Sequence, residues 1–229
     1  MADIVLIAGG RESRSQGGDP LLARTFSLLG LDKPLVAYIG AASHDNRVFF
    51  MWIKTMLRKA GAGNVRLATL AAARADLAKA RSLLQGADVV FVSGGDVEAG
   101  MQVLERTGAD SWLRELHRAG KPFIGLSAGS IMLARSWVRW PDAGDDASAE
   151  IFSCLGLAPL LCDTHAEKEG WEELQTLLRL SGRAVGHGIP AGAALRIKAD
   201  GSLSAMGKSV PRFQFLDGRL QRLADLEPA

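Results

Sequence analysis

Residues 122–135 read PFIGLSAGSIMLAR, an apolar run followed at once by a Gly/Ser-rich turn and a second apolar segment. The run ending at Leu126 has the composition of a buried strand, and residues 131–135 have that of a helix. Glycines on both sides of Ser127 permit a tight turn without side-chain clashes. A strand, a tight turn and a helix in this order are typical of an open α/β sheet, where ligands bind at the carboxyl ends of the strands.

The same alternation extends over the first 135 residues. Short apolar runs, most ending in small residues, alternate with longer segments of helical period, which predicts parallel strands joined by crossover helices. The expected strands are residues 4–8, 35–39, 65–67, 89–92 and 123–126, and the expected helices are residues 19–30, 46–60, 71–85, 97–107 and 110–119. Because the runs are apolar at consecutive positions, helices should cover both faces of a mostly parallel sheet.

The pattern changes beyond residue 136. Residues 136–149 are polar, acidic and contain Pro and Gly, which predicts a loop, and residues 169–180 predict a helix. Residues 194–197 and 212–215 are followed by Asp-Gly turns, so we expect them to add antiparallel strands to the same sheet. No repeat or linker interrupts the chain, and one α/β domain over residues 1–229 is the economical prediction.

Composition excludes several classes of protein. The 27 basic and 25 acidic residues nearly balance, so no nucleic-acid or membrane partner is expected. No apolar run approaches the ~20 residues that cross a bilayer, and the N-terminus lacks the basic region of a secretory signal. Cys154 and Cys162 cannot form a disulfide framework, so the sequence predicts a cytoplasmic location.

Ser127 is the candidate nucleophile, because a G-x-S-x-G turn between strand and helix lifts the serine oxygen out of the sheet. A serine needs a base, and His165, in a polar segment after an apolar run, suits that role. His117 lies in a charged helix and is expected at the surface. His44 follows the second strand on the same sheet edge, and His187 lies between two glycines; both remain candidates for the neighbourhood of the site.

An oxyanion would need backbone donors at the same place. One candidate is the N–H of Ala128, at the start of the expected helix. The other is an N–H from Gly94 or Gly95, at the end of the neighbouring strand. No H-E-x-x-H or paired C-x-x-C spacing indicates a metal site, and no cofactor is expected.

Three stretches now point to a family: FVSGGD at residues 91–96, GLSAGS at residues 125–130 and GLAPLLCDTH at residues 156–165. In order and spacing, the chain resembles the serine peptidases that include dipeptidase E (the aspartyl dipeptidase) and cyanophycinase, from about residue 4 to 203. The resemblance implies a class I glutamine amidotransferase-like, flavodoxin-like fold. It also implies Ser127 as nucleophile, His165 as general base, and Gly94, Gly95 and Ala128 as the oxyanion region.

Two departures from that family concern the surroundings of the histidine. Family members often have an aromatic residue after the histidine, whereas here Ala166 follows, and they often carry a glutamate where this chain has Ala191. Asp142, 15 positions after Ser127, matches an aspartate of some members and is the first candidate for the acid that orients His165. The other candidates are Asp145, Asp146, Glu150 and Asp163.

The resemblance implies hydrolysis of short peptides, with an acidic residue before the cut as one option. An acidic side chain would need an arginine, and Arg135 and Arg139 are the candidates. The alternatives are a cyanophycinase-like exopeptidase, a degenerate family member that binds a ligand or partner, an α/β-type ester hydrolase, and glutamine hydrolysis, which the serine at position 127 disfavours. Trp137 and Trp140 would pack in the core or loop, or form a pocket lid or dimer surface; the chain is expected to be a monomer or homodimer.

Overall fold

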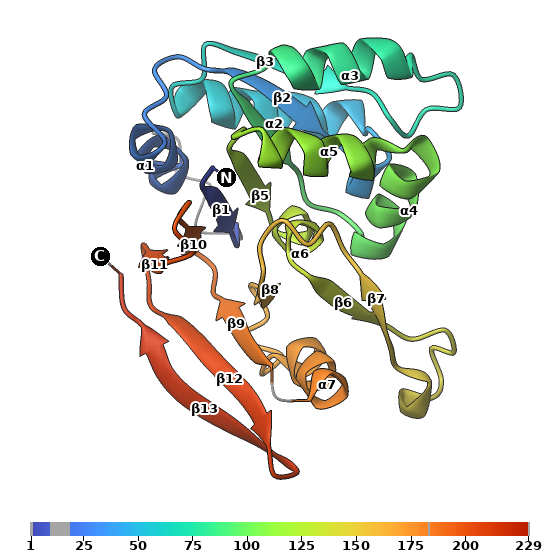
Figure 1. Ribbon diagram of the computed structural model, residues 1–229, viewed down its shortest axis with the longest axis vertical. Helices are drawn as coiled ribbons and strands as arrows, with labels where there is room; N and C mark the ends of the chain where they lie inside the picture. The colour runs from blue at the N-terminus through green and yellow to red at the C-terminus, as the bar shows by residue number, and fades with distance from the viewer. Residues whose placement is uncertain (1, 10–18, 183, 229) are drawn as a thin grey trace.

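The computed structural model describes residues 2–9, 19–182 and 184–228. Its main sheet has seven strands in the order β11-β10-β1-β5-β4-β2-β3 (Figure 1). Five of them are parallel: β1 (Ile4–Ile7), β2 (Leu35–Ile39), β3 (Asn64–Ala68), β4 (Val89–Val92) and β5 (Phe123–Leu126). Ile7 lies opposite Leu126 and Val92 lies opposite Gly125, so the carboxyl ends of β1, β5 and β4 meet at one sheet edge.

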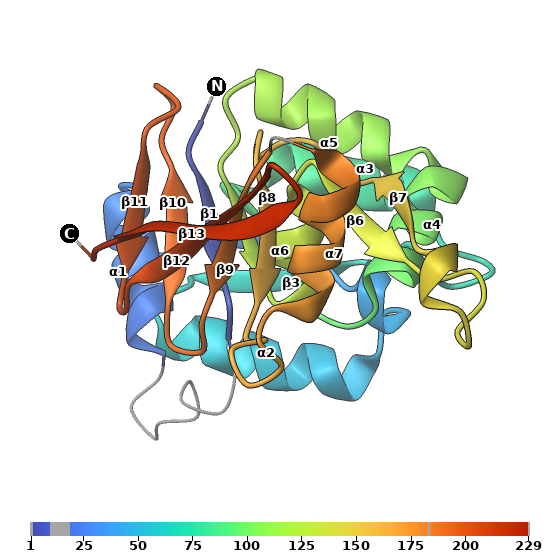
Figure 2. The ribbon, with the colours of Figure 1, turned by 90° about the horizontal axis from the view of Figure 1, so that it is seen from below.

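Helices cover both faces of this sheet, as predicted. Figure 2 shows α1 (Pro20–Leu28) and α2 (Arg47–Lys59) on one side, and α3 (Leu77–Gly86), α4 (Val97–Thr107) and α5 (Ala109–Arg118) on the other. Consecutive strand residues point to opposite faces, so Leu6 enters the core under α3, α4 and α5, whereas Val5 enters the core against α1 and α2.

The helix boundaries follow local capping. Asn46 accepts a hydrogen bond from the N–H of Phe49 at the start of α2, and Phe50, Ile53 and Leu57 then form a buried stripe at helical spacing. Helix α3 begins at Leu77, later than the expected residue 71, because the Asp76 side chain caps it.

The antiparallel strands divide between two sheets, which corrects part of the expectation. Strands β10 (Ala194–Ile197) and β11 (Leu203–Met206) join the main sheet next to β1. Strand β12 (Val210–Leu216) instead pairs with β9 (Val185–Ile189) on one side and with β13 (Arg219–Leu226) on the other. Because β9 also runs parallel to β8 (Leu161–Thr164), these strands form a second sheet of order β13-β12-β9-β8. Helix α7 (Glu172–Ser181) packs on this second sheet.

The loop expected over residues 136–149 is wrong at its start. Strand β6 (Ser136–Arg139) pairs with β7 (Glu150–Ser153) as an antiparallel hairpin, drawn beside α7 in Figure 1. Trp137 and Val138 are buried in the core. Their burial stabilises a strand here, although the segment is polar on average. The segment between the strands contains a short 3₁₀-helix, Asp146–Ser148, as does the turn at Ala41–Ser43 after β2.

Candidate active site

Ser127 occupies a strained bend between β5 and α6 (Ala128–Leu133). Its φ of 54° and ψ of −125° lie in a region that costs a non-glycine residue about 1–3 kcal/mol. Its N–H donates to the carbonyl of Ile7 at 2.9 Å, and its carbonyl accepts from the N–H of Ser130 at 2.7 Å. The serine is therefore held at the junction of β1, β5 and α6.

The glycines around Ser127 are required by close packing. A Cβ on Gly129 would lie 2.0 Å from the carbonyl oxygen of Val92, and one on Gly125 would lie 2.6 Å from the Cα of Ser130. The G-x-S-x-G pattern is thus a steric necessity of the bend, because α6 begins directly against the ends of β4 and β5.

His165 follows the last residue of β8 and faces this serine. Its backbone also has a positive φ, of 49°, and its N–H donates to the carbonyl of Ile189 in the neighbouring strand at 2.8 Å. The His165 Nε2 atom lies 2.7 Å from the Ser127 Oγ, across 38 residues of sequence. This distance lies within the hydrogen-bond reach of a serine nucleophile and its base.

Two of the three candidate oxyanion residues line the same cavity as Ser127, and the third, Gly94, lies against the serine side chain. A Cβ on Gly94 would lie 3.0 Å from the Ser127 Cβ. Gly95 has a φ of 145°, and a Cβ there would lie 2.0 Å from the carbonyl oxygen of Ala42, so only glycine fits. Gly95 and Ala128 line one cavity with Ser127, and within the described ranges no hydrogen bond occupies their backbone N–H groups.

That cavity has a volume of about 730 Å³ and is formed by the ends of β5 and β8, the starts of α4 and α7, and β6. Trp137, Trp140 and Ile131 supply apolar lining. Trp137 is at the same time a buried core residue, whereas Trp140 is half-buried. The packing role expected for Trp137 and a role in the pocket wall are therefore combined in one side chain.

Asp163 is the most perturbed acid of the cavity wall. The residue is 2% exposed; its Oδ1 accepts from the N–H of Thr164 at 2.7 Å, and its Oδ2 has no hydrogen-bond partner among the described residues. Burial raises the pKa of Asp163 to about 7, against the opposing hydrogen bond from Thr164, and the charges of Glu173, Glu169 and Glu167 raise it further. Burial also raises the pKa of Glu173.

In the part of the chain that the structure describes, none of the five candidate orienting acids has a hydrogen bond to His165. Asp142 is exposed and turns back on its own loop, where its Oδ1 accepts from the N–H of Gly144 at 3.0 Å. Asp145 caps the 3₁₀-helix of this loop, and Glu150 pairs with Arg139. Within the described residues, no hydrogen bond reaches the Nδ1 of His165.

The backbone of Ala191, where the resemblance implies a glutamate, hydrogen-bonds a carboxylate from another loop. The N–H of Ala191 donates to the Oε1 of Glu167 at 3.3 Å. Glu167 comes two residues after His165 in the chain, but among the described residues no hydrogen bond joins its carboxylate to the His165 ring.

The two arginines proposed for an acidic substrate differ in position. Arg135 is exposed and does not line the cavity. Arg139 lines it but is already paired with Glu98 at 2.9 Å and Glu150 at 2.6 Å, and these hydrogen bonds raise its pKa.

The remaining histidines lie outside the cavity. His117 is buried, contrary to the surface position expected, with its Nε2 3.2 Å from the carbonyl oxygen of Ala2. His187 is also buried, with its Nδ1 3.2 Å from the carbonyl oxygen of Leu161. Burial lowers the pKa of both. His44 is exposed at the end of the 3₁₀-helix Ala41–Ser43.

Sequence reasoning missed three glutamates in the cavity wall, Glu169, Glu172 and Glu173. In sequence they belong to a charged, helix-like segment whose default interpretation is a solvated face. The apolar positions of α7, Leu174, Leu177 and Leu178, are buried against the second sheet. Their helical spacing was the available sign that the glutamates of the first turn lie on a different face of the helix.

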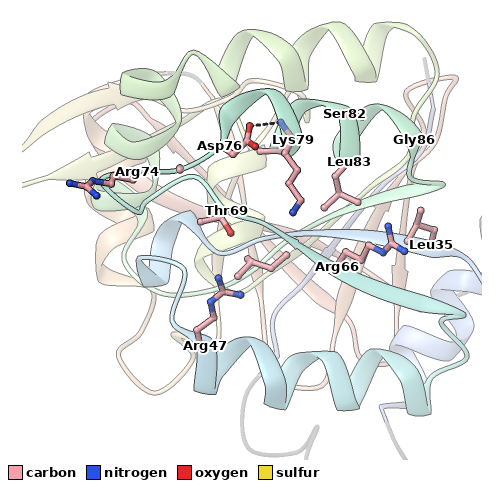
Figure 3. A pocket seen from close by; sticks show the side chains of 13 residues that line it. Leu35, Arg47, Arg66, Thr69, Arg74, Asp76, Lys79, Ser82, Leu83 and Gly86 are labelled. Carbon is pink, nitrogen blue, oxygen red and sulfur yellow. Dashed lines mark hydrogen bonds between the residues drawn. The ribbon is translucent and has the colours of Figure 1, made fainter.

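A second cavity of about 580 Å³ lies between α3, β3 and the start of α2 (Figure 3). Arg47 and Lys79 point toward its interior, whereas Arg74 points away. Its lining contains no histidine or cysteine, so it offers no base for a nucleophile.

Two further observations concern the described part of the chain. No group of three or more His, Cys, Asp or Glu side chains there is placed to hold a metal ion. None of its helices has the length and apolar character needed to span a bilayer.

A serine on the bend after a central parallel strand, hydrogen-bonded to a histidine, is the arrangement typical of α/β hydrolytic enzymes. Residues 4–204 match the model of peptidase family S51. The chain therefore belongs to peptidase family S51.

Individual proteins resemble this chain in sequence or in fold. Over 82 residues, 36% of this chain, the sequence is 37% identical to Peptidase E of Streptomyces coelicolor, and the match spans 33% of that relative's length. Among solved structures, a peptidase from an acI-B1 Actinobacterium superimposes with a TM-score of 0.73 at 18% identity, covering 99% of this chain and 96% of the other. A putative Peptidase E protein from Listeria monocytogenes EGD-e gives 0.66 at 19% identity, covering 98% and 100%. These structures share the fold.

Proposed function

We propose that the protein is a serine peptidase that hydrolyses short peptides through an acyl-enzyme on Ser127. The single observation that carries the proposal is the 2.7 Å hydrogen bond between the Ser127 Oγ and the His165 Nε2. His165 accepts the hydroxyl proton as Ser127 attacks the scissile carbonyl, and the N–H groups of Ala128 and Gly95 stabilise the oxyanion.

The second half of the cycle uses the same groups. Protonated His165 donates its proton to the leaving amine, which departs as the C–N bond breaks. His165 then takes a proton from water, whose oxygen attacks the acyl-enzyme, and returns that proton to Ser127 as the acid product leaves. No redox step or cofactor enters this balance.

A fluorophosphonate probe and a set of short peptides test the proposal. The wild-type protein should react with the probe at Ser127 and hydrolyse peptides. Ser127→Ala should lose both properties while keeping its thermal unfolding transition, and Ser82→Ala, whose serine lines the second cavity, should keep both. Full turnover by Ser127→Ala would eliminate Ser127 as the nucleophile.

A second candidate is a degenerate family member that binds a ligand or partner without turnover. The observation that favours it is the absence, among the described residues, of a hydrogen bond to the Nδ1 of His165. No probe labelling in the wild-type protein would support this candidate. Cleavage restricted to the end of a longer peptide would indicate a cyanophycinase-like exopeptidase, and cleavage after aspartate in dipeptides would indicate the Asp-Xaa specificity.

The cytoplasmic location and the monomeric or dimeric state stay predictions from the sequence. Cys154 and Cys162 are buried free thiols, and burial raises the pKa of Cys154 to about 12. Unreactive thiols of this kind fit a reducing compartment.

A further inference from the structure

The cavity that holds Ser127 and His165 is strongly acidic. Carboxylates enter it from four parts of the chain: the start of α4, the end of β8, the segment before α7 and the first turn of α7. The carboxyl-bearing residues that line it are Asp96, Glu98, Asp163, Glu169, Glu172 and Glu173. Apart from His165, Arg139 is the only basic residue among the lining residues described.

Arg139 does not balance this charge. Its guanidinium is shared by Glu98, inside the cavity, and Glu150, outside it. Two carboxylates on one guanidinium leave the group with a net negative charge. The other five lining carboxyl groups have no basic partner within the described residues. Even where Asp163 is protonated, below its raised pKa of about 7, the remaining four make the field inside the cavity negative, which favours a cation.

Asp163 is a buried residue of this cavity wall, and one of its carboxyl oxygens accepts no hydrogen bond from a described residue. The residue is 2% exposed, and no described residue offers its Oδ2 a hydrogen bond. A buried polar atom without a partner is costly. In the described part of the chain, the charged groups that act on Asp163 are acidic: Glu173 from α7, and Glu169 and Glu167 from the loop after β8.

We propose that this cavity selects short peptides with a basic side chain, lysine or arginine, and rejects those with an acidic one. The hydrolysis of such peptides rests on the proposed function, but the selection of the cation does not require turnover. A positive side chain would pair with the carboxylates of the first turn of α7, and with Asp163 once that group is ionised. An aspartate or glutamate would instead meet like charges, because Arg139 is already paired with Glu98 and Glu150.

Binding to a Ser127→Ala variant tests this without turnover. Calorimetry with the matched peptides Ala-Lys-Ala, Ala-Gln-Ala and Ala-Glu-Ala should give the tightest binding for lysine and the weakest for glutamate, with about tenfold or more between them at low salt. Added salt should reduce the difference, because screening weakens charge pairs. Equal affinities, or tighter binding of Ala-Glu-Ala, would overturn the proposal.

Variants locate the effect within the cavity. In the same background at pH 8, above the raised pKa of Asp163, Glu173→Gln and Asp163→Asn should each lower the lysine-over-glutamine preference by about two- to fivefold. Glu227→Gln, which removes a carboxylate outside the cavity, should leave the preference intact. An equal effect of all three variants would show that net charge alone, rather than this cavity, sets the preference, and would refute the assignment.

The two proposals fail in different ways. If the wild-type protein is labelled at Ser127 and cleaves Ala-Gln-Ala, but its variant binds all three peptides alike, the cation selectivity is wrong and the peptidase stands. If the variant prefers Ala-Lys-Ala while the wild-type protein is neither labelled nor active, the cation site stands and the peptidase is wrong.

Discussion

Ser127 and His165 belong to different sheets, yet their side-chain atoms lie 2.7 Å apart. Ser127 follows β5 of the seven-stranded sheet, and His165 follows β8 of the four-stranded sheet. Helix α6, which begins directly after Ser127, packs on β8, and the buried Cys162 thiol donates to the carbonyl of Ser130 at 3.8 Å. The geometry of the pair therefore depends on how the two sheets pack.

Asp142→Asn should change the rate of peptide hydrolysis less than about threefold. Its side chain is exposed and bonds the backbone of its own loop, whereas removing a true orienting acid costs ~10⁴ in turnover. Steady-state kinetics of Asp142→Asn and of Glu167→Gln, each compared with the wild-type protein, measure the change in the rate of peptide hydrolysis. A large loss in Asp142→Asn alone would mean that the loop carries the orienting acid to His165 when substrate binds.

Gly95→Ala should disrupt the backbone at the turn that we propose as part of the oxyanion region. The new Cβ would lie 2.0 Å from the Ala42 carbonyl oxygen at a φ of 145°, so the backbone must move, and we expect a loss of about 1–3 kcal/mol in unfolding free energy. Gly86→Ala is the matched control, because a Cβ there meets nothing within 4 Å. Denaturant unfolding of both variants checks the result; equal stabilities would contradict the packing seen here.

Asp163 should make stability fall as pH rises. Its folded pKa is raised to about 7 from an ordinary value of 3.8, so the folded state holds a proton that the unfolded state has released between these pH values. The penalty is absent below about pH 4, grows by at most about 1.36 kcal/mol per pH unit, and is complete above about pH 7. Asp163→Asn, which keeps an acceptor for Thr164, should remove this dependence.

Unfolding curves of the wild-type protein and Asp163→Asn at several pH values between 4 and 8 measure that difference. The variant should gain relative stability at each step upward. If the unfolding free energies of the two proteins changed with pH in the same way, ionisation of Asp163 would not destabilise the folded state.

Freeing Arg139 should improve the binding of acidic peptides. In Ser127→Ala, the added substitutions Glu98→Gln and Glu150→Gln remove both carboxylates from the guanidinium, so Ala-Glu-Ala should bind several-fold more tightly. Adding Arg139→Gln to that protein should cancel the gain, which completes a double-mutant comparison. A gain that survives the loss of Arg139 would assign it to the change in net charge.

The parallel half of the fold was predictable because its signals are local. Apolar runs such as residues 89–92, small residues at strand ends and Asp or Asn caps such as Asp96 act over a few residues. The hairpin β6–β7 was missed because its buried residues, Trp137 and Val138, are embedded in a polar, acidic segment. The second sheet was missed because β9 pairs with β8 and β12, which are distant in sequence, and the residues of a strand do not indicate which distant strand it pairs with.

By itself, the sequence determined the α/β class, the bend at Ser127 and the serine–histidine candidates, since each depends on residue types at short spacing. Tertiary structure alone decided which acids surround that pair. In the folded chain, Asp142 bonds its own loop and Glu167 bonds the backbone of Ala191. Arg139 is paired with Glu98, and the first turn of α7 lines the cavity. The physical reason is that charge acts through space: a carboxylate affects a site according to its distance and burial, and neither is encoded in its neighbours along the chain.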